Sequence, residues 1–312
     1  MPSIVQFYHP GSEHGHDFIQ KNNKYYKKWN KGEHKRKFII NNGNFIENGK
    51  KNDGKMLFWC EWEPTSLVES LNVPKITLSH EKFPEYLHYP FLPSIGRINE
   101  FQEKNYQNTD PFIFGDSFKY SICRQDSCTL LKDLEKGSLI IFGSHVNKRF
   151  VIDTIFVVLE SIKYNSALDK ELEKYGLYTE IVMKMACMEK LKQDNNLNRT
   201  LYIGATYEKS INGMFSFVPA KKYEGKKLGF SRIVMPDEFY EVKNNRINKY
   251  FSNWKINYKN SPIYEGKNTG IKETYTTIDE IKYFWNFLSD FISKDFILGY
   301  NFEMPKEEQI IK

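Results

Sequence analysis

Short runs of apolar and aromatic residues, separated by polar turn residues, recur along much of the chain. Such runs, about four to eight residues long and bounded by Gly, Asn or Asp, are typical of β-strands. The pattern predicts strands over residues 4–8, 37–40, 56–62, 112–114, 139–142, 150–159, 201–207 and 214–219. Residues 137–159 contain two apolar runs joined by a polar connection, which predicts a β-hairpin in a buried sheet.

Helical periodicity occurs in two segments, 179–192 and 277–297. In the second, Thr277 precedes an acidic first turn that contains Asp279 and Glu280, which is typical of a helix N-terminus. Apolar residues then recur on one face, so we expect this helix to pack against the sheet.

Two segments carry little periodicity and predict long loops. Residues 41–55 are rich in Gly, Asn and Lys, and residues 75–108 contain several prolines. No internal repeat or low-complexity linker divides the chain. We therefore expect one compact α+β domain over 1–312, centred on a curved or barrel-like mixed β-sheet, with 277–297 as a C-terminal packing helix.

Composition narrows the class of protein only slightly. The net charge of +6 comes from scattered lysines and permits contact with polyanions, while 20 Tyr, 24 Phe and 5 Trp suffice for a core and an exposed stacking surface. The four cysteines, Cys60, Cys123, Cys128 and Cys187, form no CxxC pair, which favours a reduced cytoplasmic protein. With no long apolar run and no secretory-type N-terminus, we expect no membrane association.

The first candidate site follows the N-terminal strand, where His9, Glu13, His14, His16 and Asp17 gather in a turn. The two closely spaced histidines could bind a metal, but no known zinc spacing is completed. A carboxylate that tunes a histidine for acid/base chemistry requires fewer coincidences. The alternative is a polar, solvated loop.

The second candidate is the segment 58–64, in which Trp59 and Trp62 alternate with Glu61 and Glu63. On a strand, one tryptophan shares a face with both glutamates, a combination that can stack a planar ring and hydrogen-bond its edge. Alternatively, the tryptophans belong to the core and the glutamates lie on a solvated face.

Two aspartates stand out for different reasons. Asp110, which precedes a proline, could activate water, but the surrounding Asn-Thr-Asp-Pro sequence also favours a simple turn. Asp153 interrupts the apolar run 150–158, so it must either pair with a cation or hydroxyl or face a pocket, and pairing is the commoner outcome.

The segment 204–217 offers aromatic and polar groups for a pocket. Tyr207 and Phe215 could stack on a base, while Glu208 and Asn212 could hydrogen-bond to its edge. The competing interpretation is a hairpin with an Asn-Gly turn and its aromatic residues in the core.

Positive charge is interleaved with aromatic residues between residues 24 and 37. Lys35, Arg36 and Lys37 could contact nucleic-acid phosphates, although such clusters are also ordinary solvated surface.

Five blocks of the sequence stand out: HPGSEH at 9–14, FWCEWEP at 58–64, NTDPFIFGD at 108–116, GSLIIFGS at 137–144 and GATYEKSINGMFSF at 204–217. They resemble those of a prokaryotic family associated with DNA base modification and phage defence. Some members of that family are similar to glycosylases that excise glucosylated hydroxymethylcytosine. None of the five blocks matches an established catalytic motif or the signatures of uracil-DNA glycosylases. The hairpin at 137–159 is also similar in topology to PUA-like and ASCH-like barrels, which bind RNA or modified bases.

The resemblance and the candidate residues together suggest a DNA glycosylase that hydrolyses the N-glycosidic bond of a modified nucleobase. The expected catalytic residues are His9, Glu13, His14, Glu61 and Asp110, and the expected base-binding residues are Trp59, Trp62, Tyr207, Glu208, Asn212 and Phe215. Neither a metal nor another cofactor is expected. The expected partner is DNA with modified bases, and RNA remains an alternative partner. The sequence does not determine the oligomeric state.

Two other functions remain open. A non-catalytic PUA-like reader would bind the modified base without breaking a bond. A metal-dependent nuclease would use His9, His14, His16 and Asp17, although their spacing is incomplete as a ligand set.

Overall fold

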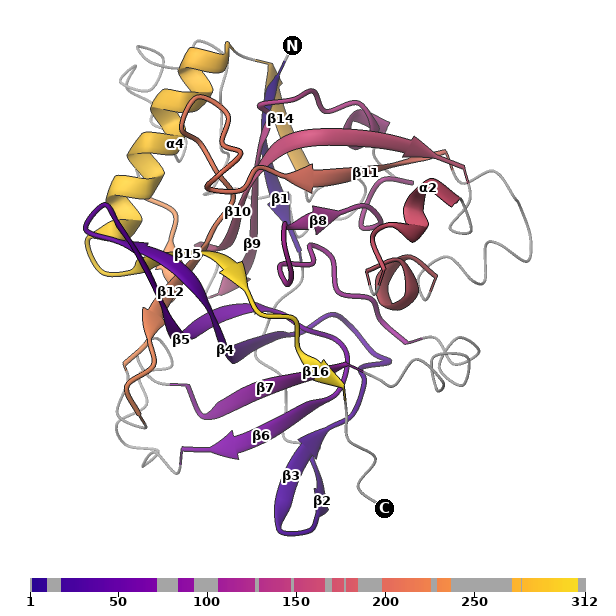
Figure 1. Ribbon diagram of the computed structural model, residues 1–312, viewed down its shortest axis with the longest axis vertical. Helices are drawn as coiled ribbons and strands as arrows, with labels where there is room; N and C mark the ends of the chain where they lie inside the picture. The colour runs from indigo at the N-terminus through magenta and orange to yellow at the C-terminus, as the bar shows by residue number, and fades with distance from the viewer. Residues whose placement is uncertain are drawn as a thin grey trace.

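The computed structural model contains two β-sheets and few helices (Figure 1). It describes residues 2–9, 18–71, 84–92, 106–126, 129–146, 149–165, 170–176, 178–184, 198–225, 229–236, 271–275 and 277–307. Parallel and antiparallel strand pairs occur in both sheets, and a helix packs beside them. The expected α+β class with mixed sheets is confirmed.

The first sheet is built around the predicted hairpin. Its strand order is β14 (Ile271–Tyr275), β1 (Ser3–Tyr8), β9 (Leu139–Val146), β10 (Arg149–Tyr164), β11 (Arg199–Gly204) and β8 (Lys119–Tyr120), with β13 (Ile233–Val234) paired to β10. β1 lies parallel to β9, whereas β9 and β10 form the antiparallel hairpin predicted for 137–159. Because both faces of β9 and of the first half of β10 are covered, residues 139–142 are apolar, and residues 150–158 are apolar except for Asp153 and Thr154.

The second sheet contains a closed circuit of strands. Its order is β15 (Ile297–Phe302), β12 (Val218–Lys222), β5 (Lys50–Glu61), β4 (Arg36–Glu47), β7 (Tyr86–Leu92), β6 (Ser66–Ser70), β3 (Lys24–Lys27) and β2 (Ile19–Lys21), and β16 (Lys306–Glu307) pairs with β7. Because β15 also pairs with β4, the strands β4, β5, β12 and β15 close on one another. Gly43 permits this closure, since a Cβ atom there would clash with the backbone oxygen of Asn301.

The long hairpin β4–β5 corrects the prediction of a loop at 41–55. Asn48 and Gly49, with φ of 50° and 72°, form a two-residue turn, and Glu47 pairs with Lys50 directly beside it. Asn-Gly is favoured in such turns because both central residues need positive φ. The polar composition reflects the exposure of this end of the hairpin, not a lack of regular structure.

The C-terminal helix prediction is confirmed over α4 (Ile278–Ser293). Thr277 caps it by accepting from the Glu280 backbone, and the Glu280 side chain accepts in return from the Thr277 backbone. Its apolar face packs with residues of β9, β10 and β15. No helix among the described residues is long and apolar enough to cross a membrane.

Other segments depart from prediction in part. Residues 179–184 form a π-helix, and the remainder of the helix predicted to 192 lies outside the described residues. The loop predicted at 75–108 contains β7, residues 84–85 and 106–108 are irregular, and its other residues lie outside the described ranges. The strand predicted at 112–114 makes only isolated bridges. The remaining helical turns are α2 (Lys170–Glu173) and a 3-10 turn, Thr129–Lys132.

The largest core cluster lies between the two sheets. It joins apolar side chains of β1, β9 and β10 to those of β4, β5 and β12. Near one end of this interface the apolar side chains give way to polar ones, where Cys60 Sγ lies 3.8 Å from Thr154 Oγ1. The interface between the two sheets therefore has an apolar part and a polar part.

Candidate functional site

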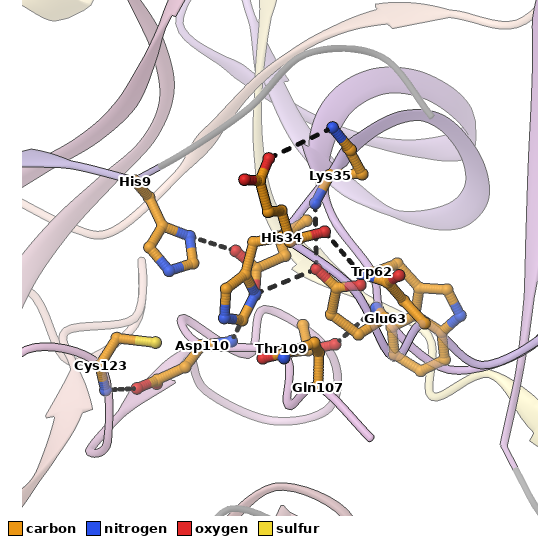
Figure 2. A network of polar contacts seen from close by, with 12 residues as sticks. His9, His34, Lys35, Trp62, Glu63, Gln107, Thr109, Asp110 and Cys123 are labelled. Atoms are coloured by element: carbon orange, nitrogen blue, oxygen red, sulfur yellow. Dashed lines mark hydrogen bonds and ion pairs between the residues drawn. The ribbon is translucent and has the colours of Figure 1, made fainter. Parts of the chain in front are cut away.

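A group of polar side chains lies where the sheets meet (Figure 2). Its members, the polar cluster, are His9, His34, Arg36, Glu61, Glu63, Asp110, Cys123 and Asp153. They come from the end of β1, from β10, from the paired ends of β4 and β5, and from the segment 106–126. Only His34 and Cys123 are partly exposed, so access to the cluster is on their side.

The register of β4 and β5 positions four of these side chains. The turn at the far end of the hairpin places Arg36 directly opposite Glu61. Two residues further from the turn, His34 Nδ1 lies 3.1 Å from Glu63 Oε1. Because side chains alternate along a strand, residues two apart project to the same face, and the four charges converge.

Glu61 is the centre of the cluster and is fully buried. Its Oε2 contacts His9 Nδ1 and accepts a hydrogen bond from Arg36 Nη1. Its Oε1 lies 3.2 Å from His34 Nδ1 and accepts from the Asp110 backbone N–H at 3.2 Å. Burial alone would raise the pKa of Glu61, but the two imidazoles outweigh it and hold this pKa well below its usual range.

The two histidines have different protonation behaviour although their ring centroids are only 4.5 Å apart. Burial lowers the pKa of His9 to about 4, and the contact with Glu61 only partly opposes this effect. For His34 burial also acts downward, but Glu61 and Glu63 raise its pKa to about 10. Near neutral pH the cluster therefore holds one neutral and one protonated imidazole, an arrangement typical of acid/base sites.

Arg36 links Glu61 to Asp153. Its Nε lies 2.5 Å from Asp153 Oδ2, an ion pair whose geometry is not aligned for a hydrogen bond. Asp153 is the extra residue at a register shift of β10, and such a bulge turns a side chain away from the regular alternation. The pairing expected for Asp153 is confirmed, although burial outweighs Arg36 and raises the pKa of Asp153 to about 6.

Asp110 has a structural role that differs from the expected activation of water. Its carboxylate accepts hydrogen bonds from the backbone N–H groups of Ser121, Ile122 and Cys123 at 3.1, 2.6 and 2.7 Å. These bonds hold the turn that presents Cys123. Burial raises the pKa of Asp110 to about 7 even though the backbone groups favour its ionised form.

The two predicted ring-stacking tryptophans are core residues. Trp59 is 2% exposed and packs with Phe38, while the Arg232 guanidinium lies 4.2 Å from its ring centroid. Trp62 is fully buried and packs with Phe114 on the other face. Neither ring is open to a flipped base, because the alternation of β5 directs both into apolar clusters.

The other predicted base-binding residues lie far from the polar cluster. Asn212 and Gly213 form the turn between Ile211 and Met214, as the alternative hairpin interpretation expected. Tyr207 and Phe215 pack on each other with centroids 5.1 Å apart. Glu208 pairs with Lys51 at the turn end of β5, whereas Glu61 lies ten residues along that strand, about 33 Å for an extended chain.

Two of the three predicted phosphate contacts are buried. Arg36 and Lys37 are 1% and 0% exposed, because their side chains bind Glu61 and the Trp62 carbonyl oxygen inside the protein. Burial lowers the pKa of Lys37 to about 8. Lys35 is partly exposed, with its Nζ 3.9 Å from Glu33. The prediction for Arg36 and Lys37 is therefore corrected, since neither reaches the surface.

The structure thus brings His9, Glu61 and Asp110 together, whereas Glu13 and His14 lie outside the described residues. Sequence reasoning missed His34 and Cys123 as members of this site, and it placed Glu63 in the second candidate segment but not among the expected catalytic residues.

Two sets of side chains among the described residues could hold a metal ion. One is His9, His34 and Cys123, and the other is His34, Glu61 and Glu63. In each set the candidate ligand atoms lie within 4.8 Å of one another.

Comparison with known proteins gives no assignment of family. No family model, curated protein or solved structure matches the chain. The chemistry of the polar cluster is therefore the basis for a functional proposal.

Proposed function

We propose that this protein is a hydrolase whose reaction takes place at the partly exposed side of the polar cluster, and that its substrate is the N-glycosidic bond of a modified nucleobase in DNA. The observation that carries this proposal is the convergence of His9, Glu61 and Asp110 from three separate segments of the chain. The resemblance of the sequence blocks supports the choice of substrate.

The cluster has the groups that such a hydrolysis needs. Cleavage of an N-glycosidic bond requires an activated water molecule or stabilisation of the positive sugar, and a proton for the departing base. Glu61 and Glu63 supply negative charge, and His34 is a proton donor on the accessible side. Asp110 contributes by fixing the turn that carries Cys123.

A groove on the second sheet, whose charged lining residues are Lys24 and Glu69, supports a planar partner. It measures about 790 Å³ and is lined in part by Phe18, Tyr86 and Tyr89. Lys24 and Tyr25 also line it, and the Tyr25 side chain is 46% exposed. Aromatic faces beside a lysine can stack unpaired bases and attract phosphate.

The proposal is tested with matched duplexes, one plain and one containing glucosylated hydroxymethylcytosine. We expect alkali-labile abasic sites in the modified duplex alone. Glu61→Gln should lower the rate at least about 100-fold, because it removes the charge that orients both histidines. Glu47→Gln, at the exposed end of the same hairpin, is the control and should retain the rate. Equal rates for Glu61→Gln and wild type would refute the proposed site.

The groove favours a second candidate, a reader that binds the modified base without cleaving it. In that case the β9–β10 hairpin would belong to a PUA-like unit. The reader predicts selective retardation of modified DNA with no abasic sites, and loss of retardation in Tyr25→Ala. Direct backbone scission would instead favour the nuclease.

A further inference from the structure

Three potential metal ligands converge on the accessible side of the polar cluster. A ring nitrogen of His9, a ring nitrogen of His34 and Cys123 Sγ lie within 4.8 Å of one another. Figure 2 shows the outer ring nitrogens and the sulfur turned toward a common space. Around a tetrahedral zinc ion such atoms lie roughly 3.3–3.7 Å apart, so small side-chain rotations would complete the geometry.

The hydrogen bonds of the cluster leave the correct nitrogen of each histidine available. Each Nδ1 faces a carboxylate oxygen, of Glu61 for His9 and of both Glu61 and Glu63 for His34. With Nδ1–H directed at a carboxylate, the lone pair of His9 belongs to Nε2, and the contact of Arg36 Nη1 with His9 Nδ1 is then not a hydrogen bond. His34, which is protonated near neutral pH, gains the same lone pair when its Nε2 loses a proton. The His9 ring is 3% exposed, and among the described residues its polar contacts, with Glu61 and Arg36, are at Nδ1.

Glu61 has the position of an outer-shell residue of a metal site. Histidines that ligate a metal generally donate their other N–H to a carboxylate, which fixes the ring orientation and increases ligand basicity. Here one carboxylate performs this role for two rings, with one oxygen for each. Arg36 and the Asp110 backbone N–H hold that carboxylate in place.

We propose that His9 Nε2, His34 Nε2 and Cys123 Sγ bind one zinc ion, with a fourth position open to water. Two imidazoles and a thiolate suit zinc, and three protein ligands with one open position are characteristic of catalytic sites. This inference goes beyond the proposed function and does not depend on its substrate. It replaces the expectation, drawn from sequence, that the protein uses no metal.

Binding would change the charge of the site in a defined way. The Cys123 thiol binds the metal as a thiolate, and the protonated His34 ring loses its Nε2 proton to become a ligand, so both protons pass to solvent. In the metal-bound site His34 therefore no longer serves as a proton donor. The ion would then activate water at the open position, on the side where His34 and Cys123 are partly exposed.

The alternative set of His34, Glu61 and Glu63 fits the observed contacts less well. Both oxygens of Glu61 are already occupied by imidazole, guanidinium and backbone donors. Glu63 Oε1 similarly faces His34 Nδ1 and accepts from the Lys35 backbone N–H at 3.2 Å, whereas Glu63 Oε2 is buried without a hydrogen-bond partner among the described residues. A metal at the Glu61 oxygens would displace several hydrogen bonds, whereas the first set uses the Nε2 side of each ring, away from the Nδ1 contacts that the described residues make.

The test is direct metal binding by the full chain after removal of bound metal with a chelator. Titration with Zn²⁺, followed by calorimetry, should show one ion per chain and release of protons to the buffer. Titration with Co²⁺ as a spectroscopic probe should give tetrahedral visible bands and a thiolate-to-cobalt band in the near ultraviolet. Because the cobalt spectrum is recorded on the unmutated protein, this test does not depend on whether any variant folds.

Variants assign the ligands. Cys123→Ser should abolish the thiolate band and weaken zinc binding at least about 100-fold, while Glu61→Gln should weaken it about 10- to 100-fold and keep the band. Cys60→Ala removes the other free thiol among the described residues and should leave both signals unchanged. Circular dichroism checks that each variant is folded.

Three results would overturn the assignment. These are no stoichiometric binding by the folded protein, binding without a thiolate band, and a Cys123→Ser variant with wild-type affinity and spectrum. If Glu63→Gln abolished binding while Cys123→Ser preserved it, the ion would belong to the carboxylate set. None of these outcomes depends on glycosylase activity, so failure of the metal proposal is distinguishable from failure of the proposed substrate.

Discussion

The two ends of the β4–β5 hairpin both carry opposite charges in contact, but in opposite environments. At the open end, Arg36 and Glu61 are almost fully buried and share partners from the other sheet. At the turn end, Lys51 and Glu208 lie 3.0 Å apart with side chains that are 53% and 57% exposed. The distance between the charged groups is similar, whereas the solvent around them differs.

This difference determines what each ion pair does. The charges of an exposed pair are well hydrated when they are apart, so their contact adds little to the free energy of folding. Salt screens this contact further. A buried charge cannot be hydrated when its partner is removed, so the loss of the partner carries a large cost in the free energy of folding. The buried end is therefore the end at which a single substitution can change stability or chemistry.

The strongest effect is expected for Arg36→Met. This change leaves Glu61 and Asp153 buried without the guanidinium between them, and should lower the free energy of unfolding by about 3–5 kcal/mol. Urea denaturation measures the loss. The double variant Arg36→Met, Asp153→Asn should recover part of it, and a single variant as stable as wild type would show that the guanidinium does not hold this cluster together.

The pH dependence of Asp153→Asn is the next largest effect. Burial raises the pKa of Asp153 from 3.8 to about 6 in the folded protein, so between those pH values the folded chain keeps a proton that the unfolded chain loses. The contribution of Asp153 to stability is therefore full below pH 4 and is lost as the pH rises through 6. Relative to Asp153→Asn, the wild type should lose about 3 kcal/mol between pH 4 and 7. Parallel stability curves for the two proteins would contradict this assignment.

Between the two ends, Gly43→Ala tests the closure of the strand circuit. The added Cβ would clash with the backbone of Asn301 on β15, so β4 and β15 must separate. We expect a loss of about 1–3 kcal/mol in the free energy of unfolding, measured by urea denaturation. Gly32→Ala is the matched control, because its nearest heavy atom is 3.7 Å away and its stability should not change.

The smallest effect is expected at the turn end. Lys51→Met breaks the contact with Glu208 on the surface, where water replaces the lost partner. The denaturation midpoint should stay within experimental error of the wild-type value, both in low salt and in high salt. A clear drop in the denaturation midpoint in low salt would mean that the exposed ion pair contributes to stability as a buried pair does, despite its contact with solvent.

The sequence contained enough information to place part of the polar cluster. Asn48–Gly49 is a strong turn signal, and the pairing of Glu47 with Lys50 fixes the register of the whole hairpin. Counted outward from that turn, Arg36 falls opposite Glu61, and His34 falls opposite Glu63. The polar composition of 41–55 favours a loop and hides this relation, although the Asn-Gly turn signal inside the segment favours a hairpin.

Other parts of the site depend on contacts between segments far apart in the chain. His9 and Cys123 reach the cluster only because β1 packs across from the β4–β5 hairpin and because Asp110 holds the turn at 121–123. Neither relation has a local pattern. The same limit applies to Trp59 and Trp62, since alternation predicts that they face opposite sides but not that both sides are covered.

The closed circuit of β4, β5, β12 and β15 also affects how the protein can associate with other chains. A strand whose backbone groups are paired on both sides offers no template for the addition of a foreign strand. The opposite end of the same sheet is β2, a strand of three residues that ends in Lys21 and leads into the turn at Asn22 and Asn23. A short strand with a charged terminus and a sharp turn is a poor site for edge-to-edge pairing. The closed circuit and this short edge strand should therefore both limit aggregation through β-strand exchange.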